Sequence, residues 1–257
     1  MTTSLDPSRW TLFVADDPDE RRAAFRARFE EVAKDAAAAR GRFVVALTGG
    51  STVPQYYPAL VDADVDWSTV HVLFGDERAV GPDHPDSNAR ACREALLDHV
   101  TIPAAQVHRM EGELADPEQA ASRYAEVLRR VAGAPPVIDL LHLGLGPDGH
   151  VASLFPGHPG PGETERTVLS VADSPKPPPR RVTLSLPVLT AARETWLFAH
   201  GENKRAAVAR AATEPTSELP VARVLQRAPR VLVFIDTSNA QVFPVDTPRA
   251  TPDRDRL

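Results

Sequence analysis

Short apolar runs alternate with longer helical segments along the first half of this chain. Apolar runs at residues 10–14, 43–47, 70–74 and 138–143 predict strands buried in a parallel sheet. Helix-start signals such as Asp17-Pro18 and Asp116-Pro117 predict helices that run to about residues 40 and 131, and two more helices are expected after Pro54 and over 86–99. Further strands are predicted at 182–186, 194–199 and 231–235, with helices near 204–212 and 220–227.

This order of elements predicts an α/β fold: a doubly wound, mostly parallel, Rossmann-like sheet flanked by helices. The sequence shows no repeat and no linker, so we expect one domain over residues 1–257, with a core at about 10–238. The tail at 239–257 has no firm pattern and is expected to be loose. The prolines of segment 174–181 predict a stiff, extended stretch.

Composition narrows the class of protein. The 42% hydrophobic and 25% charged content is ordinary for a soluble globular chain, and the net charge of −6 disfavours general nucleic-acid binding. Cys92 is the only cysteine, which excludes an intramolecular disulfide and a zinc site built from cysteines. We see no secretory signal and no apolar run near the ~18 residues of a membrane span, so we expect a cytoplasmic protein without a membrane partner.

The run at residues 143–150, LGLGPDGH, is the most informative motif of the chain. It follows a predicted buried strand, and its three glycines and one proline turn the backbone where Asp148 and His150 appear. A histidine at a strand end can serve as a general base near neutral pH. The plainer alternative is a turn in which Asp148 and His150 only satisfy backbone groups.

Two other predicted strands also end in polar residues. Gly49, Gly50, Ser51 and Thr52 come between a strand and a helix, where backbone N–H groups and hydroxyls can bind a phosphate, although an ordinary capped turn is the alternative. The charged cluster 76–78, Asp-Glu-Arg, ends the next strand. Its charges either pair with one another or with a ligand, or the segment is a plain solvated loop. Because the carboxyl ends of parallel strands meet at one edge of a sheet, all three motifs are expected to lie together.

The second half of the chain supplies cations. Lys176, Arg180 and Arg181 lie in the proline-rich segment and either bind an anion or belong to a charged surface loop. Lys204 stands at the start of a helix, where the helix dipole disfavours a cation, so a bound anion or plain solvent exposure would explain it. The other histidines show no metal-ligand spacing, so we expect no metal.

Taken together, these motifs resemble those of the 6-phosphogluconolactonase family. The matching segments are residues 48–52, 74–78, 84–88, 143–157, 174–184 and 201–204, and in order they span about residues 10–236. The block GPDGHVASLFPG at 146–157 is the most specific of them. The resemblance implies a fold shared with glucosamine-6-phosphate deaminases. It also implies hydrolysis of a small phosphosugar lactone, 6-phospho-D-glucono-1,5-lactone, in the oxidative pentose phosphate pathway, without cofactor. We take a monomer as the default.

The resemblance also implies roles for single residues. His150 would take a proton from the attacking water, Asp148 would support the imidazolium, and Arg78, held by Asp76 or Glu77, would contact the sugar or the developing oxyanion. Asp76 is counted among the substrate-binding residues. The phosphate would be gripped by Gly49, Gly50, Ser51 and Thr52 with Lys176, Lys204 and one of Arg180 and Arg181, whose register the sequence leaves open.

Two alternatives remain beside the lactonase. A deaminase on the same fold would carry an acidic residue five positions after the histidine of the DGH motif, and this chain has Phe155 there. A non-catalytic sugar-phosphate sensor would usually carry a DNA-binding helix-turn-helix, for which the N-terminal sequence offers no room. Both comparisons favour the lactonase.

Overall fold

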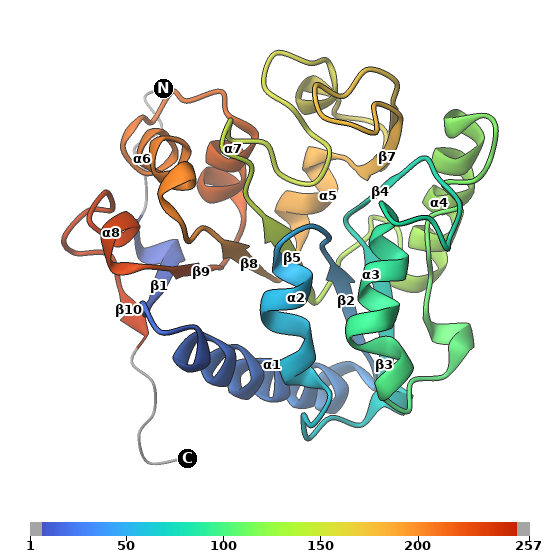
Figure 1. The fold of residues 1–257 in the computed structure, drawn as a ribbon, viewed down its shortest axis with the longest axis horizontal. Coiled ribbons are helices and arrows are strands. Elements are labelled where there is room, and N and C mark those ends of the chain that lie inside the picture. Colours follow the sequence, from blue (N-terminus) through green and yellow to red (C-terminus); the bar gives the residue numbers. More distant parts are fainter. Residues whose placement is uncertain (1–6, 251–257) are drawn as a thin grey trace.

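A seven-stranded parallel sheet organises the chain in the computed structural model, which describes residues 7–250 (Figure 1). The strand order is β10-β1-β9-β8-β5-β2-β3, and every pairing is parallel. The strands are β1 (Trp10–Val14), β2 (Phe43–Leu47), β3 (Val70–Phe74), β5 (Leu140–Gly144), β8 (Glu194–Phe198), β9 (Val231–Ile235) and β10 (Arg249–Ala250). The predicted doubly wound α/β fold is confirmed.

Helices cover both faces of this sheet. They are α1 (Pro18–Arg40), α2 (Thr52–Tyr56), α3 (Asn88–Ala95), α4 (Pro117–Ala132), α5 (Leu186–Ala191), α6 (Arg205–Thr213), α7 (Pro220–Arg227) and α8 (Thr237–Ala240). An aromatic-rich core packs α1, α2 and α3 against one face, centred on Phe25, Phe29 and Trp196. A mainly aliphatic core packs α4, α5, α6 and α7 on the other face. The continuous apolar strands are explained by this double coverage.

A second, three-stranded antiparallel sheet was not expected from the sequence. Its order is β4-β7-β6, from β4 (Asp76–Arg78), β7 (Arg181–Leu184) and β6 (Val168–Val171). Strand β4 is three charged residues long and has no apolar pattern, so only its pairing with β7 identifies it as a strand. This small sheet begins two residues after β3 ends and therefore places residues 76–78 at the edge of the main sheet.

Three local expectations are corrected. The segment 174–181 is not extended: the backbone N–H of Ser174 donates to the carbonyl of Pro179 (2.9 Å), which closes it into a loop between β6 and β7. The helix after β2 begins at Thr52, two residues before Pro54. The helix expected over 86–99 ends at Ala95, and a short 3₁₀ turn at 97–99 follows it.

The expected loose tail is ordered as far as the structure describes it. Asn239 is fully buried in α8, and β10 pairs with β1 at Leu12 and Phe13. The short tail strand lacks an apolar pattern, so its order comes from pairing that local sequence does not reveal. Residues 251–257 lie outside the described part of the chain.

Candidate active site

A pocket of about 210 Å³ opens where the carboxyl ends of β2, β5 and β8 meet the small antiparallel sheet. The pocket is lined by most of the predicted site residues: Gly49, Gly50, Ser51, Thr52, Asp76, Arg78, His150, Lys176, Arg181 and Lys204. Asp148 lies just behind His150, and Arg180 alone among the predicted residues points elsewhere, toward the carbonyl of Ala115 (3.4 Å). The expectation that the three strand-end motifs meet at one edge is confirmed.

His150 and Asp148 form a close pair on the turn after β5. Nδ1 of His150 lies 2.5 Å from Oδ1 of Asp148, and Nζ of Lys176 lies 3.3 Å from the same oxygen and 3.4 Å from Nδ1. The turn is tight: a side chain at Gly146 would come within 2.0 Å of Nδ1 of His150, so only glycine fits. The pair leaves Nε2 of His150 without a hydrogen-bond partner in the described chain.

The electrostatics of this pair favour a neutral histidine beside an ionised carboxylate. Burial lowers the pKa of His150, the hydrogen bond and charge of Asp148 oppose this, and the ammonium of Lys176 lowers it further. Burial alone would raise the pKa of Asp148, but the bond to His150 and the charges of His150 and Lys176 outweigh it and leave that pKa lowered. Neutral His150 can therefore donate from Nδ1 to Asp148 and accept a proton at Nε2.

The opposite wall of the pocket is built on a buried carboxylate, Glu77. Its two oxygens accept four hydrogen bonds, from the backbone N–H groups of Arg78, Asn88 and Ala89 and from the hydroxyl of Ser87, at 2.7–3.0 Å. Burial raises the pKa of Glu77, and these donors oppose the rise. Glu77 therefore anchors the start of α3 to β4 and faces away from the pocket, which it does not line.

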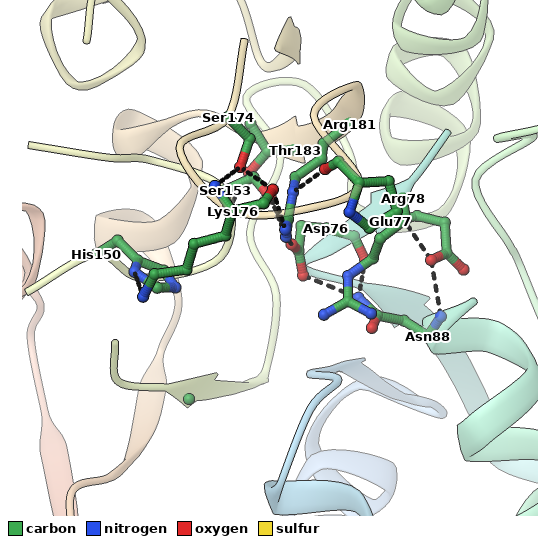
Figure 2. Close-up of polar contacts among 12 residues, drawn as sticks. Asp76, Glu77, Arg78, Asn88, His150, Ser153, Ser174, Lys176, Arg181 and Thr183 are labelled. Carbon is green, nitrogen blue, oxygen red and sulfur yellow. Dashed lines mark hydrogen bonds and ion pairs between the residues drawn. The ribbon is translucent and has the colours of Figure 1, made fainter. Parts of the chain in front are cut away.

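Asp76 and Arg78 flank Glu77 and both line the pocket. The side chain of Asp76 accepts from the hydroxyl of Ser153 (2.6 Å) and from the amide of Asn88 (3.1 Å), as Figure 2 shows. Glu77 holds Arg78 as expected, but only through the backbone N–H of Arg78 (2.7 Å); the guanidinium donates instead to the backbone carbonyl of Asp86 (2.7 Å). In the described chain its Nε is buried without a partner.

The register of β7 decides between the two arginines of the proline-rich segment. Arg181 is 4% exposed and points inward, whereas Arg180 is exposed. The guanidinium of Arg181 donates to the carbonyls of Lys176, Pro177 and Pro178 (3.1–3.2 Å) and lies over the ring of Phe155. Most of its donors thus hold the loop 174–180 in place, and only its Nη1 faces Asp76 (3.9 Å) and Ser153 (3.5 Å).

The glycine loop after β2 is held from two sides. The hydroxyl of Tyr57 accepts the backbone N–H of Thr48 (2.9 Å), and the amide of Asn88 lies so close to Gly49 that a side chain there would come within 1.8 Å of Oδ1. The hydroxyl of Ser51 makes no capping bond to α2. Nζ of Lys204 donates to the carbonyl of Leu145, and burial followed by the charge of Lys176 lowers the pKa of Lys204.

The family model described as glucosamine-6-phosphate isomerases/6-phosphogluconolactonase matches residues 16–233 of this chain. The chain belongs to this family. Its curated relatives include a 6-phosphogluconolactonase of Streptomyces coelicolor, 41% identical over 247 residues that cover 91% of this chain and 94% of the relative. Another from Homo sapiens is 42% identical over 217 residues, or 81% of this chain and 84% of the relative.

A solved structure of the glucosamine-6-phosphate isomerase/6-phosphogluconolactonase family has the same architecture. It is a 6-phosphogluconolactonase from Trypanosoma brucei with a TM-score of 0.81 and 30% identity, covering 93% of this chain and 99% of its own. No helix in the described part of this chain is long and apolar enough to cross a membrane. The described residues also contain no group of three or more His, Cys, Asp or Glu side chains placed to hold a metal ion.

Asn88 and His200, which line the pocket, and Ser153, which bonds to Asp76, were not predicted as site residues. In the sequence, Asn88 has the pattern of a helix cap and His200 that of a surface or core histidine. Ser153 lies in the family motif, but no role was predicted for it. The usable signal for Ser153 was its position three residues after His150 in a specific motif. Asn88 and His200 reach the pocket only through the packing of α3 and β8, which the local sequence does not encode.

Proposed function

We propose that this chain hydrolyses 6-phospho-D-glucono-1,5-lactone to 6-phospho-D-gluconate, with His150 as the general base. The observation that carries the proposal is the 2.5 Å contact between Nδ1 of His150 and Oδ1 of Asp148, which leaves Nε2 of His150 free at the pocket. The close relatives that carry the name 6-phosphogluconolactonase support the same reaction.

The proposed reaction begins when Nε2 of His150 takes a proton from a water as that water attacks the lactone carbonyl. Asp148 supports the imidazolium that forms, since its carboxylate accepts from Nδ1. Arg78 faces the developing oxyanion with a guanidinium that the carbonyl of Asp86 holds in place. The imidazolium then returns its proton to the departing ring oxygen, so no covalent intermediate is needed.

The phosphate is proposed to bind at the glycine loop. Gly50, Ser51 and Thr52 offer backbone N–H groups and free hydroxyls, and Lys204 adds a charge across the pocket. Lys176 and Arg181 are proposed to act from the other side: Lys176 beside His150, and Arg181 through the Nη1 group that faces Asp76 and Ser153. Arg180 has no place in this scheme because it points away from the pocket.

Deamination of an amino sugar phosphate is the less favoured function for the same pocket. Phe155, which takes the place of the acidic residue expected for that chemistry, is 1% exposed and its ring lies 4.7 Å from that of His150. A buried apolar ring at this point cannot exchange protons with an amino sugar.

The single-domain organisation, the monomer, the cytoplasmic location and the absence of a nucleic-acid partner stay predictions. Size-exclusion chromatography coupled to light scattering tests the monomer. The function itself is tested by following acid release, or by coupling to 6-phosphogluconate dehydrogenase, with freshly made lactone and the purified protein. We expect acceleration well above the spontaneous rate; an equal rate with and without protein would refute the proposed reaction.

A further inference from the structure

His200 lies two residues after the end of β8 and lines the same pocket as the glycine loop and Lys204. Its neighbours Ala199 and Gly201 are unusually well fixed. The buried amide of Asn239 donates to both of their carbonyls, at 3.0 and 2.9 Å, and the backbone N–H of Gly201 donates to Asp236 (2.6 Å). The fold therefore presents His200 to the pocket on a backbone that is held on both sides.

The ring of His200 is positioned but not bonded. It packs against the ring of Tyr56 in α2, with centroids 5.8 Å apart, and neither ring nitrogen hydrogen-bonds to the part of the chain that the structure describes. The charged groups that face it are Arg21, Lys204 and Asp236. Burial lowers the pKa of His200, the two cations lower it further and Asp236 opposes them, so the ring is neutral near pH 7 with one free N–H donor.

The cationic donors of the pocket are already partly bonded to other groups of the chain. The ammonium of Lys176 lies at Asp148 and His150, and the guanidinium of Arg181 is largely committed to three loop carbonyls. Beside the glycine loop this leaves Lys204, whose Nζ already donates to the carbonyl of Leu145. A phosphate monoester offers three acceptor oxygens and favours every donor within reach.

We propose that His200 is a phosphate-binding residue, whose ring N–H donates to the phosphate of the sugar substrate beside Lys204 and residues 50–52. This inference rests on the proposed function, because it assumes a phosphorylated substrate. In this role His200 selects phosphorylated over unphosphorylated lactones and takes part in no step of the hydrolysis.

The test compares His200→Phe with the wild type on 6-phosphogluconolactone and on unphosphorylated glucono-1,5-lactone. Phenylalanine keeps the packing on Tyr56 and removes the donor. We expect KM for the phosphorylated lactone to rise about 10-fold to 100-fold, with kcat little changed and with kcat/KM for the unphosphorylated lactone unchanged. His200→Gln, which keeps an amide donor, should recover part of the loss.

His71→Phe is the matched control, since His71 is also half-buried but bonds to His108 outside this pocket, and its KM should stay at the wild-type value. An unchanged KM in His200→Phe, or an equal loss on both lactones, would overturn the proposal. Should His200→Phe not fold by circular dichroism, His200→Ala replaces it under the same criteria.

Calorimetric binding of 6-phosphogluconate separates this inference from the proposed function. If the wild type did not hydrolyse the lactone, the function would fail, while weaker binding of 6-phosphogluconate by His200→Phe would still support the phosphate contact. Equal binding by the two proteins would reject it.

Discussion

The two sides of the pocket are built in opposite ways. On the β5 side, His150 and Lys176 are partly exposed and Asp148 is exposed, and the three groups share one hydrogen-bonding cluster. On the β4 side, Asp76, Glu77 and Asn88 are buried, and neighbouring backbone groups and hydroxyls hold them. The groups suited to proton transfer thus lie on the β5 side, and the groups with a fixed geometry lie on the β4 side.

This difference has a physical reason. A group that exchanges protons with water must keep contact with solvent and with a partner that stabilises both of its charge states. A group that orients a substrate must instead lose little order on binding, which a buried wall of mostly hydrogen-bonded groups provides. Variants of the two sides should therefore have separable effects on catalysis and on stability.

The largest effect is expected from His150→Ala. Removing the proposed base should lower kcat by about 10²-fold to 10⁴-fold, because proton transfer from water is then unassisted. Binding of 6-phosphogluconate should change little, since the β4 side and the glycine loop remain. Stopped-flow or coupled assays give kcat and calorimetry gives the affinity. A fully active His150→Ala protein would remove His150 from the mechanism.

Arg181→Met should act on stability. It leaves Asp76 without its nearby cation and three loop carbonyls without donors, so the free energy of unfolding should fall by about 3 kcal/mol. Urea denaturation measures this. Arg180→Met is the matched control, because this exposed neighbour should change stability by less than about 0.5 kcal/mol. Equal losses in the two variants would contradict the inward orientation of Arg181.

Gly49→Ala tests the contact between the glycine loop and the β4 side. The new methyl group would lie within 1.8 Å of Oδ1 of Asn88, so we expect a loss of about 2 kcal/mol in stability and a higher KM. Adding Asn88→Ala removes the obstructing amide and should restore part of the loss, which is a non-additive result. Additive losses in the double variant would show that the two residues do not interact.

The smallest effect on kcat is expected from Lys176→Met, and it appears as a shift of the pH profile in addition to the higher KM expected from a lost phosphate contact. Because the pKa of His150 is lowered, its base form persists below pH 6.5, and kcat/KM should fall only as pH drops through that lowered pKa. Removing the Lys176 cation raises the pKa of His150, so the acidic limb moves to higher pH. At saturating lactone, activity at pH 6 relative to that at pH 8 should fall by less than about tenfold. If the acidic limb of the pH profile did not move, the charge of Lys176 would have no effect on the pKa of His150.

Much of this fold could be predicted because local signals agreed with it. Phe43–Leu47 is apolar throughout and forms an interior strand of the sheet, and Asp17 and Gly41 mark both ends of α1. The pairing of Asp148 with His150 follows from a tight turn, which local sequence controls.

Other features depend on contacts between distant segments. The small sheet forms because Arg78 pairs with Arg181 across about a hundred residues, and that register alone turns Arg181 inward and Arg180 outward. His200 lies in the pocket because β8 neighbours β5, and Asn88 because Glu77 draws α3 onto β4. These partners lie from 11 to about a hundred residues apart, so periodicity and capping rules could not identify them.

Strand β10 has a consequence for handling this protein. Two residues, Arg249 and Ala250, pair with β1, and the backbone N–H of Leu12 donates to Pro248 (2.8 Å), so β1 is not the outermost strand (Figure 1). Removing residues 245–257 would leave the backbone of β1 open to strands of other molecules, and an open apolar edge is a template for aggregation. A shortened protein would therefore lose solubility before it lost its pocket.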